Sequence, residues 1–366
     1  MATRLGTPKG GAVPKLRSRE QGAAVPLTDW DRRLLNLLQS RFPLEPRPFE
    51  AVARDAGATE GEVMERTQWL LDQRIIREIT PIFDTTALGY SSMLVAASVD
   101  PEHPHRAAAI INEHPGVSHN YLRNHDFNLW FTIATAPDSR LGLDGTLEVL
   151  QEQSGATSMR QLPTLTMFKI NMNLEMEGGT KALAAAVEAV EPLPREPIPI
   201  DDFDVAVVRA TQGPMEVRPD AYAPAAEQLG VPVERLLEHL REMTERRLLR
   251  RVAGILFHRR AGFSANGMGV WKVPEDRIME LGPRMAAVRG VSHCYRRPTY
   301  RDWPYSVFTM AHGRSKEECD AVLDGVAEIC GLHGPDRSTL YSSTEYKKIR
   351  LHYFTPDYAA WETRYS

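Results

Sequence analysis

The sequence predicts an α+β protein built as a tandem repeat, each copy a winged helix-turn-helix followed by a ferredoxin-like βαββαβ domain. The first observation is internal self-similarity. The segment "LLDQRIIREITPIFDTTALGY" (70–90) aligns without a gap with "MTERRLLRRVAGILFHRRAGF" (243–263), mostly apolar residue on apolar residue. The second is a shared motif, because Gly-Val-Ser-His occurs at 116–119 and again at 290–293. Two such copies in one chain predict an internal pseudo-dimer.

Each copy opens with a helical pattern. In "TDWDRRLLNLLQSRF", Thr28 is a suitable N-cap, and Leu34 and Leu38 fall on one apolar stripe. A shorter helix, "FEAVARDAG", ends at Gly57, and Thr59 then begins a third helix in "TEGEVMERTQWLLDQR". Three helices followed by the two expected strands "IIREIT" and "PIFD" are typical of a winged helix-turn-helix.

The hydrophobic period then changes from helical to alternating. The first copy gives a strand "SMLVAASV", a helix "PHRAAAIINEHP", a hairpin of "VSHNYLRN" and "FNLWFTIATA", a helix "LGLDGTLEVLQEQSG" and a closing strand "RQLPTLTMFKI". The second copy repeats this order from "MGVWKV" to "STLYSSTEYKKIRLHYF". The predicted boundaries are a flexible tail (1–26), helix-turn-helix domain 1 (27–90), ferredoxin-like domain 1 (91–177), a linker (178–200), helix-turn-helix domain 2 (201–263), ferredoxin-like domain 2 (264–355) and a C-terminal tail (356–366).

The composition argues against several classes of protein. A net charge of −4 over 366 residues gives no global attraction to nucleic acid or to an anionic membrane. The three cysteines show no CxxC spacing and no metal-ligand pattern stands out, so neither a disulfide framework nor a bound metal is expected, and a cytoplasmic protein fits best. Residues 1–26 lack the apolar run of a signal peptide, and no later stretch approaches the length of a membrane span.

The helix-turn-helix raises the question of DNA binding. The third helix presents Glu60, Glu62 and Glu65 against Arg66 and the more distal Arg74. Phosphate contacts need Lys or Arg, and base reading needs Arg, Lys, Asn or Gln near the start of the recognition helix. The charge therefore predicts a structural helix-turn-helix and argues against DNA as a partner.

The most informative feature is the motif His-x-Tyr-x-Arg, which recurs in the hairpin of both copies. Because side chains alternate along a strand, the three residues share one face. Histidine can donate a proton or ligate iron, arginine can clamp a carboxylate, and tyrosine can pack beside a flat ligand. The members are His119, Tyr121, Arg123 and then His125 in the first copy and His293, Tyr295 and Arg297 in the second, with Arg296 on the opposite face and Trp303 and Tyr305 in a longer loop.

Structural roles stay open for each of these residues alone. A lone strand histidine is most often a satisfied structural residue, and Tyr and Trp in strands are most often core. Arg123 could merely pair with Glu113 or Asp126 at the surface. Recurrence of the motif at the same place favours a ligand, since a generic core has little reason to keep it. The set fits an anionic, planar ligand that carries carboxylates.

These residues carry a resemblance to a known family. The segments "FPLEPRPFEAVA", "GVSHNYLRNHDFNLWFT" and "GVSHCYRRPTYRDWPYSVFTMAHG" resemble the siroheme decarboxylases, whose halves have the Lrp/AsnC architecture, and the chain is similar to the fused two-subunit form from denitrifiers. The resemblance implies a carboxy-lyase that removes the C12 and C18 acetate carboxyl groups of siroheme as CO2, giving 12,18-didecarboxysiroheme on the way to heme d1. It implies no cofactor beyond the iron-containing substrate. Related decarboxylase subunits and a second copy of the chain are the partners it suggests.

The resemblance also implies roles for the motif residues. His119, His125 and His293 would deliver protons to the methylene carbons. A histidine could instead be an axial ligand of the siroheme iron, and the sequence does not separate these roles. A different class of function also stays open, a ligand-responsive transcription regulator of the Lrp/AsnC type. The expected substrate-binding residues are Tyr121, Arg123, Tyr295, Arg296, Arg297, Trp303 and Tyr305.

Overall fold

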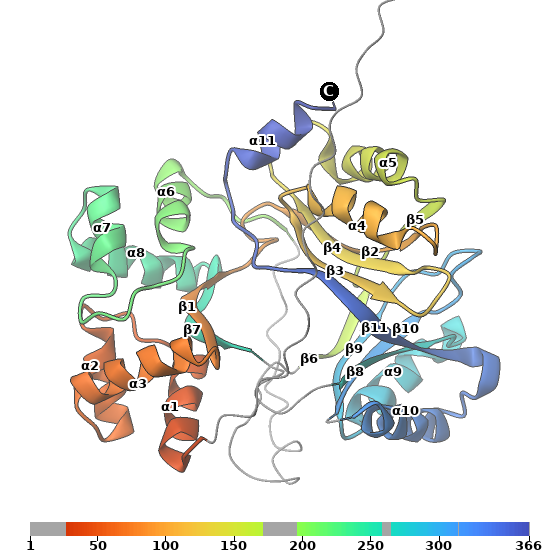
Figure 1. Cartoon of the computed structure of the whole chain (residues 1–366), viewed down its shortest axis with the longest axis horizontal. Coiled ribbons are helices and arrows are strands. Elements are labelled where there is room, and N and C mark those ends of the chain that lie inside the picture. Colours follow the sequence, from red (N-terminus) through yellow and green to blue (C-terminus); the bar gives the residue numbers. More distant parts are fainter. Residues whose placement is uncertain (1–26, 171–195, 258–264, 314, 366) are drawn as a thin grey trace, which may run out of the picture.

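The computed structural model describes residues 27–170, 196–257, 265–313 and 315–365. Figure 1 shows two bodies, with the helix-turn-helix elements of both copies on one side and the two ferredoxin-like domains on the other. The predicted α+β tandem repeat is confirmed. The predicted tail, 1–26, and most of the predicted linker, 178–200, lie outside the described residues. None of the described helices is long and apolar enough to cross a membrane.

Local sequence signals set the helix ends. The Thr28 hydroxyl accepts from the Asp31 N–H at 3.2 Å while the Asp31 carboxylate accepts from the Thr28 N–H at 2.8 Å, a capping box that begins α1. Gly57 has a φ of 68°, the left-handed conformation that ends α2. The helices are α1 (Asp29–Ser40), α2 (Pro48–Ala56) and α3 (Glu60–Asp72) in the first copy and α6 (Asp202–Thr211), α7 (Ala223–Leu229) and α8 (Val233–Glu245) in the second.

The two strands expected for the wing are in fact one strand. The segments "IIREIT" and "PIFD" together form β1 (Ile76–Phe83), which pairs antiparallel with β7 (Leu249–Leu256) of the other copy. A hairpin would need reversing residues between the segments, whereas Thr80 and Pro81 both continue the extended pairing. Pro81 is tolerated because a two-stranded ribbon leaves each strand one open edge. The two helix-turn-helix units therefore share one ribbon.

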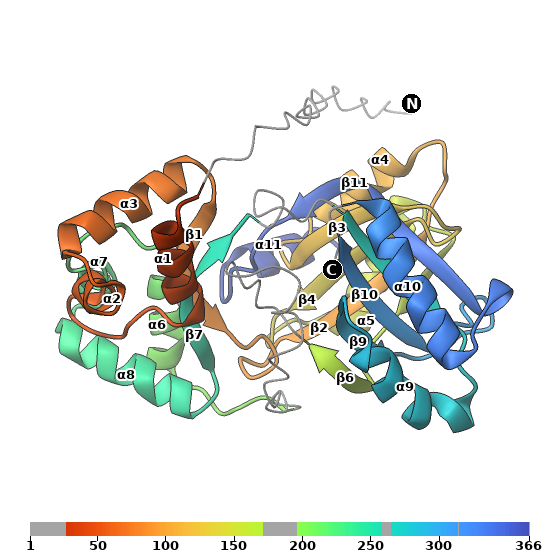
Figure 2. The ribbon, with the colours of Figure 1, turned by 90° about the horizontal axis from the view of Figure 1, so that it is seen from below.

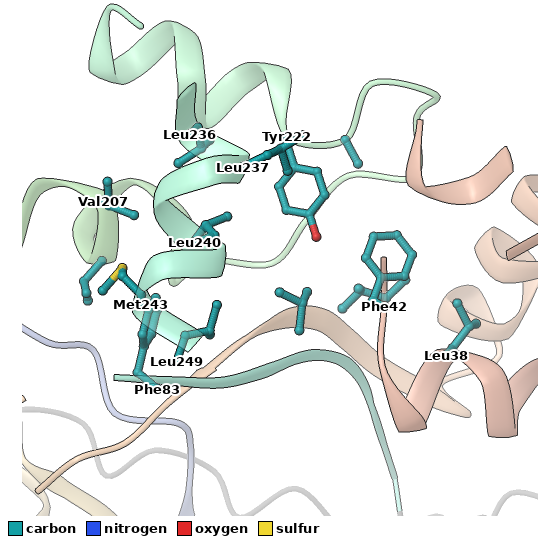
Figure 3. Close-up of a cluster of buried hydrophobic side chains, with 14 of the residues drawn as sticks. Leu38, Phe42, Phe83, Val207, Tyr222, Leu236, Leu237, Leu240, Met243 and Leu249 are labelled. Carbon is teal, nitrogen blue, oxygen red and sulfur yellow. The ribbon is translucent and has the colours of Figure 1, made fainter. Parts of the chain in front are cut away.

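The helices of both copies pack around a shared hydrophobic core (Figure 3). Phe42 of the first copy and Tyr222 of the second are buried with ring centroids 6.5 Å apart, and the Tyr222 hydroxyl donates to the Pro43 carbonyl at 2.9 Å. Leu240 and Met243 of α8 are fully buried in the same cluster. Because both copies build this core, neither helix-turn-helix is complete alone.

All other described strands join one nine-stranded sheet in the order β5-β2-β4-β3-β11-β8-β10-β9-β6. The strands are β2 (Ser91–Ser98), β3 (Val117–Arg123), β4 (Leu129–Thr135), β5 (Ser158–Gln161), β6 (Thr166–Ile170), β8 (Ala265–Trp271), β9 (Val291–Arg296), β10 (Val307–Gly313) and β11 (Arg337–Lys348). The helices of these domains are α4 (Pro104–Asn112), α5 (Gly142–Ser154), α9 (Ile278–Ala287) and α10 (Lys316–Cys330), with short 3-10 turns at Glu275–Arg277 and Gly334–Asp336.

The closing strands are exchanged between the copies. β11 pairs first with β8 of its own copy and then, along its second part, with β3 of the first copy. The single closing strand expected from "RQLPTLTMFKI" is interrupted. Its first part, β5, pairs with β2, and after Pro163 the chain continues as β6 beside β9 of the second copy (Figure 2). Proline lacks the N–H that a ladder needs, so the pairing changes there.

The sheet has a helix-covered face and an inner face. On the covered face, α4 and α5 pack on the first domain and α9 and α10 on the second (Figure 1). On the inner face, Trp130 and Phe308 meet with ring centroids 6.3 Å apart, in a cluster with Met268 and Leu340. The two domains thus face each other across a core of their own. Alternation along each strand decides which side chains enter it.

The expected C-terminal tail, 356–366, contains a docked helix, α11 (Asp357–Glu362). Trp361 is only 2% exposed, and its ring packs edge to face on His114 of the first copy, with centroids 4.5 Å apart. The Glu362 carboxylate accepts hydrogen bonds from the Ser139 hydroxyl and the Arg140 N–H, just before α5. The end of the second copy therefore covers part of the first.

Candidate active site

The His-x-Tyr-x-Arg residues of both copies lie on the inner face of the sheet. On β3, Asn120 points the other way, toward α4, where its side chain donates to Asn112 Oδ1 at 3.0 Å. Alternation then places His119, Tyr121 and Arg123 on the inner face. On β9 the same argument applies, because the intervening cysteine packs in the helix-covered core.

The two motif histidines have matching local contacts. The Ser118 Oγ lies 3.0 Å from His119 Nδ1, and the Ser292 Oγ lies 2.7 Å from His293 Nδ1. Each ring tilts against the following tyrosine, with centroids 6.2 and 5.9 Å apart. Burial, aided by positive neighbours, lowers the pKa of each histidine to about 4. Both rings are therefore neutral at pH 7 until an anion lies beside them.

The two motif arginines reach across to the other copy. Arg123 Nη1 donates to the Leu340 carbonyl at 3.0 Å, and Arg297 donates to the Leu162 carbonyl, the matching position of the first copy. The Nε of each is buried and has no hydrogen-bond partner among the described residues. Burial lowers the pKa of both to about 10, so both stay charged at neutral pH. Two buried cations whose nearest bonds go to carbonyl groups favour an anionic ligand.

His125 lies just after β3 and meets the long loop of the second copy. Its Nδ1 accepts from the Phe127 N–H at 3.0 Å, which orients the ring. The ring packs against Trp303 and Tyr305, with centroids 5.2 and 6.4 Å away. Burial lowers the pKa of His125 as well. The fold thus brings His125 and Tyr305 together, although they come from different copies.

Trp303, expected to bind the substrate, is instead a core residue. It is fully buried in the inner cluster, 5.2 Å from the Trp130 ring. The loop that carries it is fixed to the first copy, because Arg160 binds Asp302 through two bonds of 2.8 and 3.0 Å and the Tyr300 hydroxyl donates to a carbonyl of β5. Trp303 therefore supports the site from inside and offers no surface to a ligand.

Arg296, also expected to bind the substrate, lies away from the motif side chains. It follows Tyr295 directly, and adjacent strand residues point to opposite faces. Its guanidinium pairs with Glu275 on the helix-covered side. The prediction that it binds with the other arginine is not supported by this placement.

The two motif strands differ in their neighbours on the inner face. β11 places Glu345 beside Tyr121 and Lys348 beside His119, and both of these charged residues are exposed. β6 places Met167 beside Tyr295 at the matching position of the other copy. The strand beside the first motif therefore contributes charged, exposed residues, and the strand beside the second contributes an apolar residue at the position that matches Glu345.

Sequence reasoning missed two residues beside the second motif. His312 on β10 has its ring centroid 6.2 Å from that of His293, and its Nδ1 lies 2.6 Å from Asn266 Oδ1 on β8. The signal was present in the alternation of Phe308, Met310 and His312, two of which enter the inner cluster. Once β10 is paired with β9, that alternation puts His312 on the inner face.

Two surface hollows of the described residues are lined by residues other than the motif side chains. One of about 470 Å³ lies under α11, between Glu113 and Trp361, and one of about 560 Å³ lies beside Glu275 and Thr299. Within the described ranges, no group of three or more His, Cys, Asp or Glu side chains could hold a metal ion. The candidate site is therefore defined by the inner-face side chains.

The arginine of the third helix, Arg66, is held by an ion pair within its own domain. Arg66 on α3 binds Asp31 through Nε and Nη2 at 2.5 and 2.8 Å and lies over the Trp69 ring at 3.7 Å. The Glu62 carboxylate accepts from the Thr59 N–H at 2.8 Å as part of a capping box. Because the arginine is already bound, it is poorly placed to contact phosphate.

Known families and proteins match most of the chain. The Siroheme decarboxylase NirDL-like HTH domain family matches residues 31–77, and the AsnC-like ligand binding domain family matches residues 87–169 and 260–347. The siroheme decarboxylase of Hydrogenobacter thermophilus is 36% identical over 329 residues, which cover 90% of this chain and 96% of that protein. The siroheme decarboxylase beta subunit of Methanosarcina barkeri is 34% identical over 154 residues, 42% of this chain and 100% of that subunit.

A solved structure matches over nearly the same extent. The crystal structure of the siroheme decarboxylase NirDL in co-complex with an iron-uroporphyrin III analogue is 31% identical with a TM-score of 0.72, covering 92% of this chain and 98% of that chain. The match includes both helix-turn-helix units and both sheet domains, since nine-tenths of the chain takes part. This chain belongs to the siroheme decarboxylase family.

Proposed function

We propose that this chain removes the C12 and C18 acetate carboxyl groups of siroheme as CO2 and yields 12,18-didecarboxysiroheme for heme d1 biosynthesis. The observation that supports this most is the paired motif, in which two histidines, two tyrosines and two buried arginines share the inner face. The relatives named siroheme decarboxylases, and the complex of one of them with an iron-uroporphyrin analogue, indicate the same ligand chemistry.

The reaction needs positioning and protons. The bond between the carboxyl carbon and the methylene carbon breaks, CO2 leaves, and the electron pair stays on the methylene carbon, delocalised into the macrocycle. One proton then completes the methyl group. Each acetate therefore consumes one proton and no oxidant, and we propose that no organic cofactor takes part. The protein has to hold the other carboxylates and deliver one proton at each position.

We assign proton delivery to His119 and His293, one in each copy, with His125 as a further donor. Burial lowers the pKa of His119 and His293 to about 4, so an empty site holds neutral rings. A substrate carboxylate beside either ring favours the imidazolium and raises its pKa. Substrate binding would thus load the proton that the reaction consumes.

Arg123 and Arg297 supply positive charge for the substrate carboxylates, since each keeps a buried Nε without a partner among the described residues. Trp303 and Arg296, which the fold places away from the other motif side chains, are assigned no part in binding the substrate. Packing beside the macrocycle is assigned to the tyrosines of the inner face and of the long loop, Tyr121, Tyr295 and Tyr305.

The proposal extends to partners and location. A relative that spans less than half of this chain is named a beta subunit, so the two copies here correspond to subunits that are separate chains elsewhere. Companion subunits and a second copy of this chain are proposed partners, to be tested by light scattering of the purified protein. The cytoplasm is the proposed location, because the three cysteines are free and buried, as in proteins of reducing compartments.

The test is anaerobic incubation of the purified protein with siroheme, followed by extraction and mass analysis of the tetrapyrrole. The expected result is a product that lacks two carboxyl groups. Siroheme that co-purifies but is recovered unaltered would contradict the proposal and favour a carrier or a transcription regulator. A gel retardation assay with promoter DNA at moderate salt would then separate those two.

A further inference from the structure

The second motif has a polar neighbour set that the first lacks. Asn266 on β8, His312 on β10 and His293 on β9 come from three adjacent strands and lie on the inner face. The His312 Nδ1 lies 2.6 Å from Asn266 Oδ1, and the His312 and His293 ring centroids are 6.2 Å apart. Two imidazoles and one amide are thus gathered at the open end of the second domain.

The matching positions of the first domain carry no such chemistry. Phe308 lies opposite Tyr295, and Trp130 lies opposite Tyr121. Four residues further along these strands stand His312 in the second domain and Ala134 in the first, so these two positions correspond. Asn266 pairs with His312, and its counterpart Ser92 pairs with Ala134. Since the backbone register is the same in both domains, the difference lies in the side chains alone.

The contact with Asn266 fixes how His312 can act. A carbonyl oxygen only accepts, so the proton of the neutral ring lies on Nδ1 and the ring orientation is set. Rings whose centroids are 6.2 Å apart lie within reach of proton transfer directly or through one water. The nearby Lys169 is directed to the helix-covered side, where its Nζ donates to the Ala286 carbonyl at 2.9 Å.

We propose that His312, held by Asn266, is a positioning residue that restores to His293 the proton spent on each turnover in the second domain. The inference rests on the proposed function. His312 takes up a solvent proton at its Nε2 and becomes the imidazolium, while Nδ1 stays bonded to Asn266. His293 gives its proton to the methylene carbon as CO2 departs, and the Nε2 proton of His312 then passes to His293, which leaves His312 neutral again. No electron is gained or lost in this sequence. The first domain must reprotonate His119 by another route.

The test compares three variants in the anaerobic siroheme assay. His312→Ala is expected to lower kcat about 10-fold to 100-fold with KM little changed, because the proton supply is removed and the binding groups are not. Added imidazole is expected to restore part of that loss. Asn266→Ala is expected to lower kcat less, about threefold to tenfold, since the ring stays but is no longer oriented. The matched control is Ser92→Ala in the first domain, expected to have parental kinetics.

Several outcomes would overturn the inference. The first is a His312→Ala variant with the parental kcat. The second is a variant in which only KM changes. The third is a fall in kcat that added imidazole does not reverse, together with a lower melting temperature. His312→Gln keeps the size and a hydrogen-bond donor but cannot relay a proton, so it gives the same test if the alanine variant fails to fold. If the parent protein itself leaves siroheme unaltered, the proposed function fails; if the parent is active and His312→Gln is equally active, only this inference fails.

Discussion

The strands β3 and β9 carry the same three motif residues in the same register, yet they lie in different surroundings. Both histidines contact a serine, and both arginines bond to a carbonyl of the opposite copy. The first strand lies beside exposed charges, whereas the second lies beside an apolar residue and a second imidazole. The two copies therefore share the motif residues and their contacts, and they differ in the residues that surround the motif.

The largest expected effect comes from removing each motif histidine in turn. His293→Ala and His119→Ala are each expected to slow one decarboxylation by about 10²-fold to 10⁴-fold, so that a product lacking a single carboxyl group accumulates. The two losses should be of similar size, because burial and two positive neighbours lower the pKa of each histidine to about 4. Mass analysis of the products over time measures both. Identical losses with identical products would show that the two copies do not act separately.

Removing the motif arginines should affect both copies alike. Arg123→Met and Arg297→Met are each expected to weaken siroheme binding about 10-fold to 100-fold, the size of one charge-assisted hydrogen bond. An absorbance titration with siroheme measures the affinity, and Arg296→Met is the matched control, because that side chain lies on the helix-covered face. If Arg123→Met and Arg297→Met both bind siroheme with parental affinity, these arginines do not bind the substrate, and their role is to hold the two copies together.

A third difference between the copies concerns the turn before each motif strand. His114 of the first copy is buried under Trp361, whereas the second copy has Val288 there. Burial lowers the pKa of His114 to about 3 in the folded protein. The pKa of a histidine in the unfolded chain is near 6.5, so above that pH the ring is neutral in both states and its burial causes no pH dependence. As the pH falls from about 6.5 toward 3, the unfolded chain binds the proton and the folded protein does not, so this group lowers the free energy of unfolding by about 1.4 kcal/mol per pH unit.

Denaturant unfolding at pH 7 and pH 5 tests this expectation. The variant His114→Val, which copies the second half, should lose about 2 kcal/mol less than the parent between those two pH values. An equal loss in parent and variant would assign the pH dependence to other buried histidines.

The smallest effect is expected from the charge beside His119. Lys348→Ile gives the first copy the residue type found opposite His293, where Ile170 lies in register. KM for siroheme is expected to rise about fivefold, the size of one partly screened charge contact, with kcat unchanged or slightly raised. Steady-state kinetics at two salt concentrations measures it. A fall in kcat with constant KM would mean that Lys348 takes part in the chemistry.

The local elements were predictable because their signals are local. Thr28 and Gly57 mark helix ends through contacts within a few residues, and strand alternation placed the motif side chains on one face. The relation between the copies was not predictable in the same way. Nothing near Pro81 indicates that β1 pairs with β7, and nothing near Pro163 indicates which sheet β6 joins, because the partner strands lie in the other copy.

For the candidate site, too, the features within one copy were predictable and the relation between the copies was not. The residues of each motif share one strand face as expected. That both motifs lie on one inner face, and that His125 meets the long loop of the second copy, was not predicted. The prediction that Trp303 contacts the ligand is not supported, since its loop folds inward and fills the core, which the sequence does not show. His312 was missed because its significance depends on strand pairing, which sets it next to His293.

The exchange of β6 and β11 has a consequence for how the halves find each other. Either copy produced alone would expose the unpaired edge of β3 or β9, and these edges are alike enough to pair with a second identical copy. Joining the copies in one chain raises the effective concentration of the correct partner above that of any free competitor. The fusion would therefore guarantee a one-to-one mixed assembly, so that every molecule receives both kinds of site.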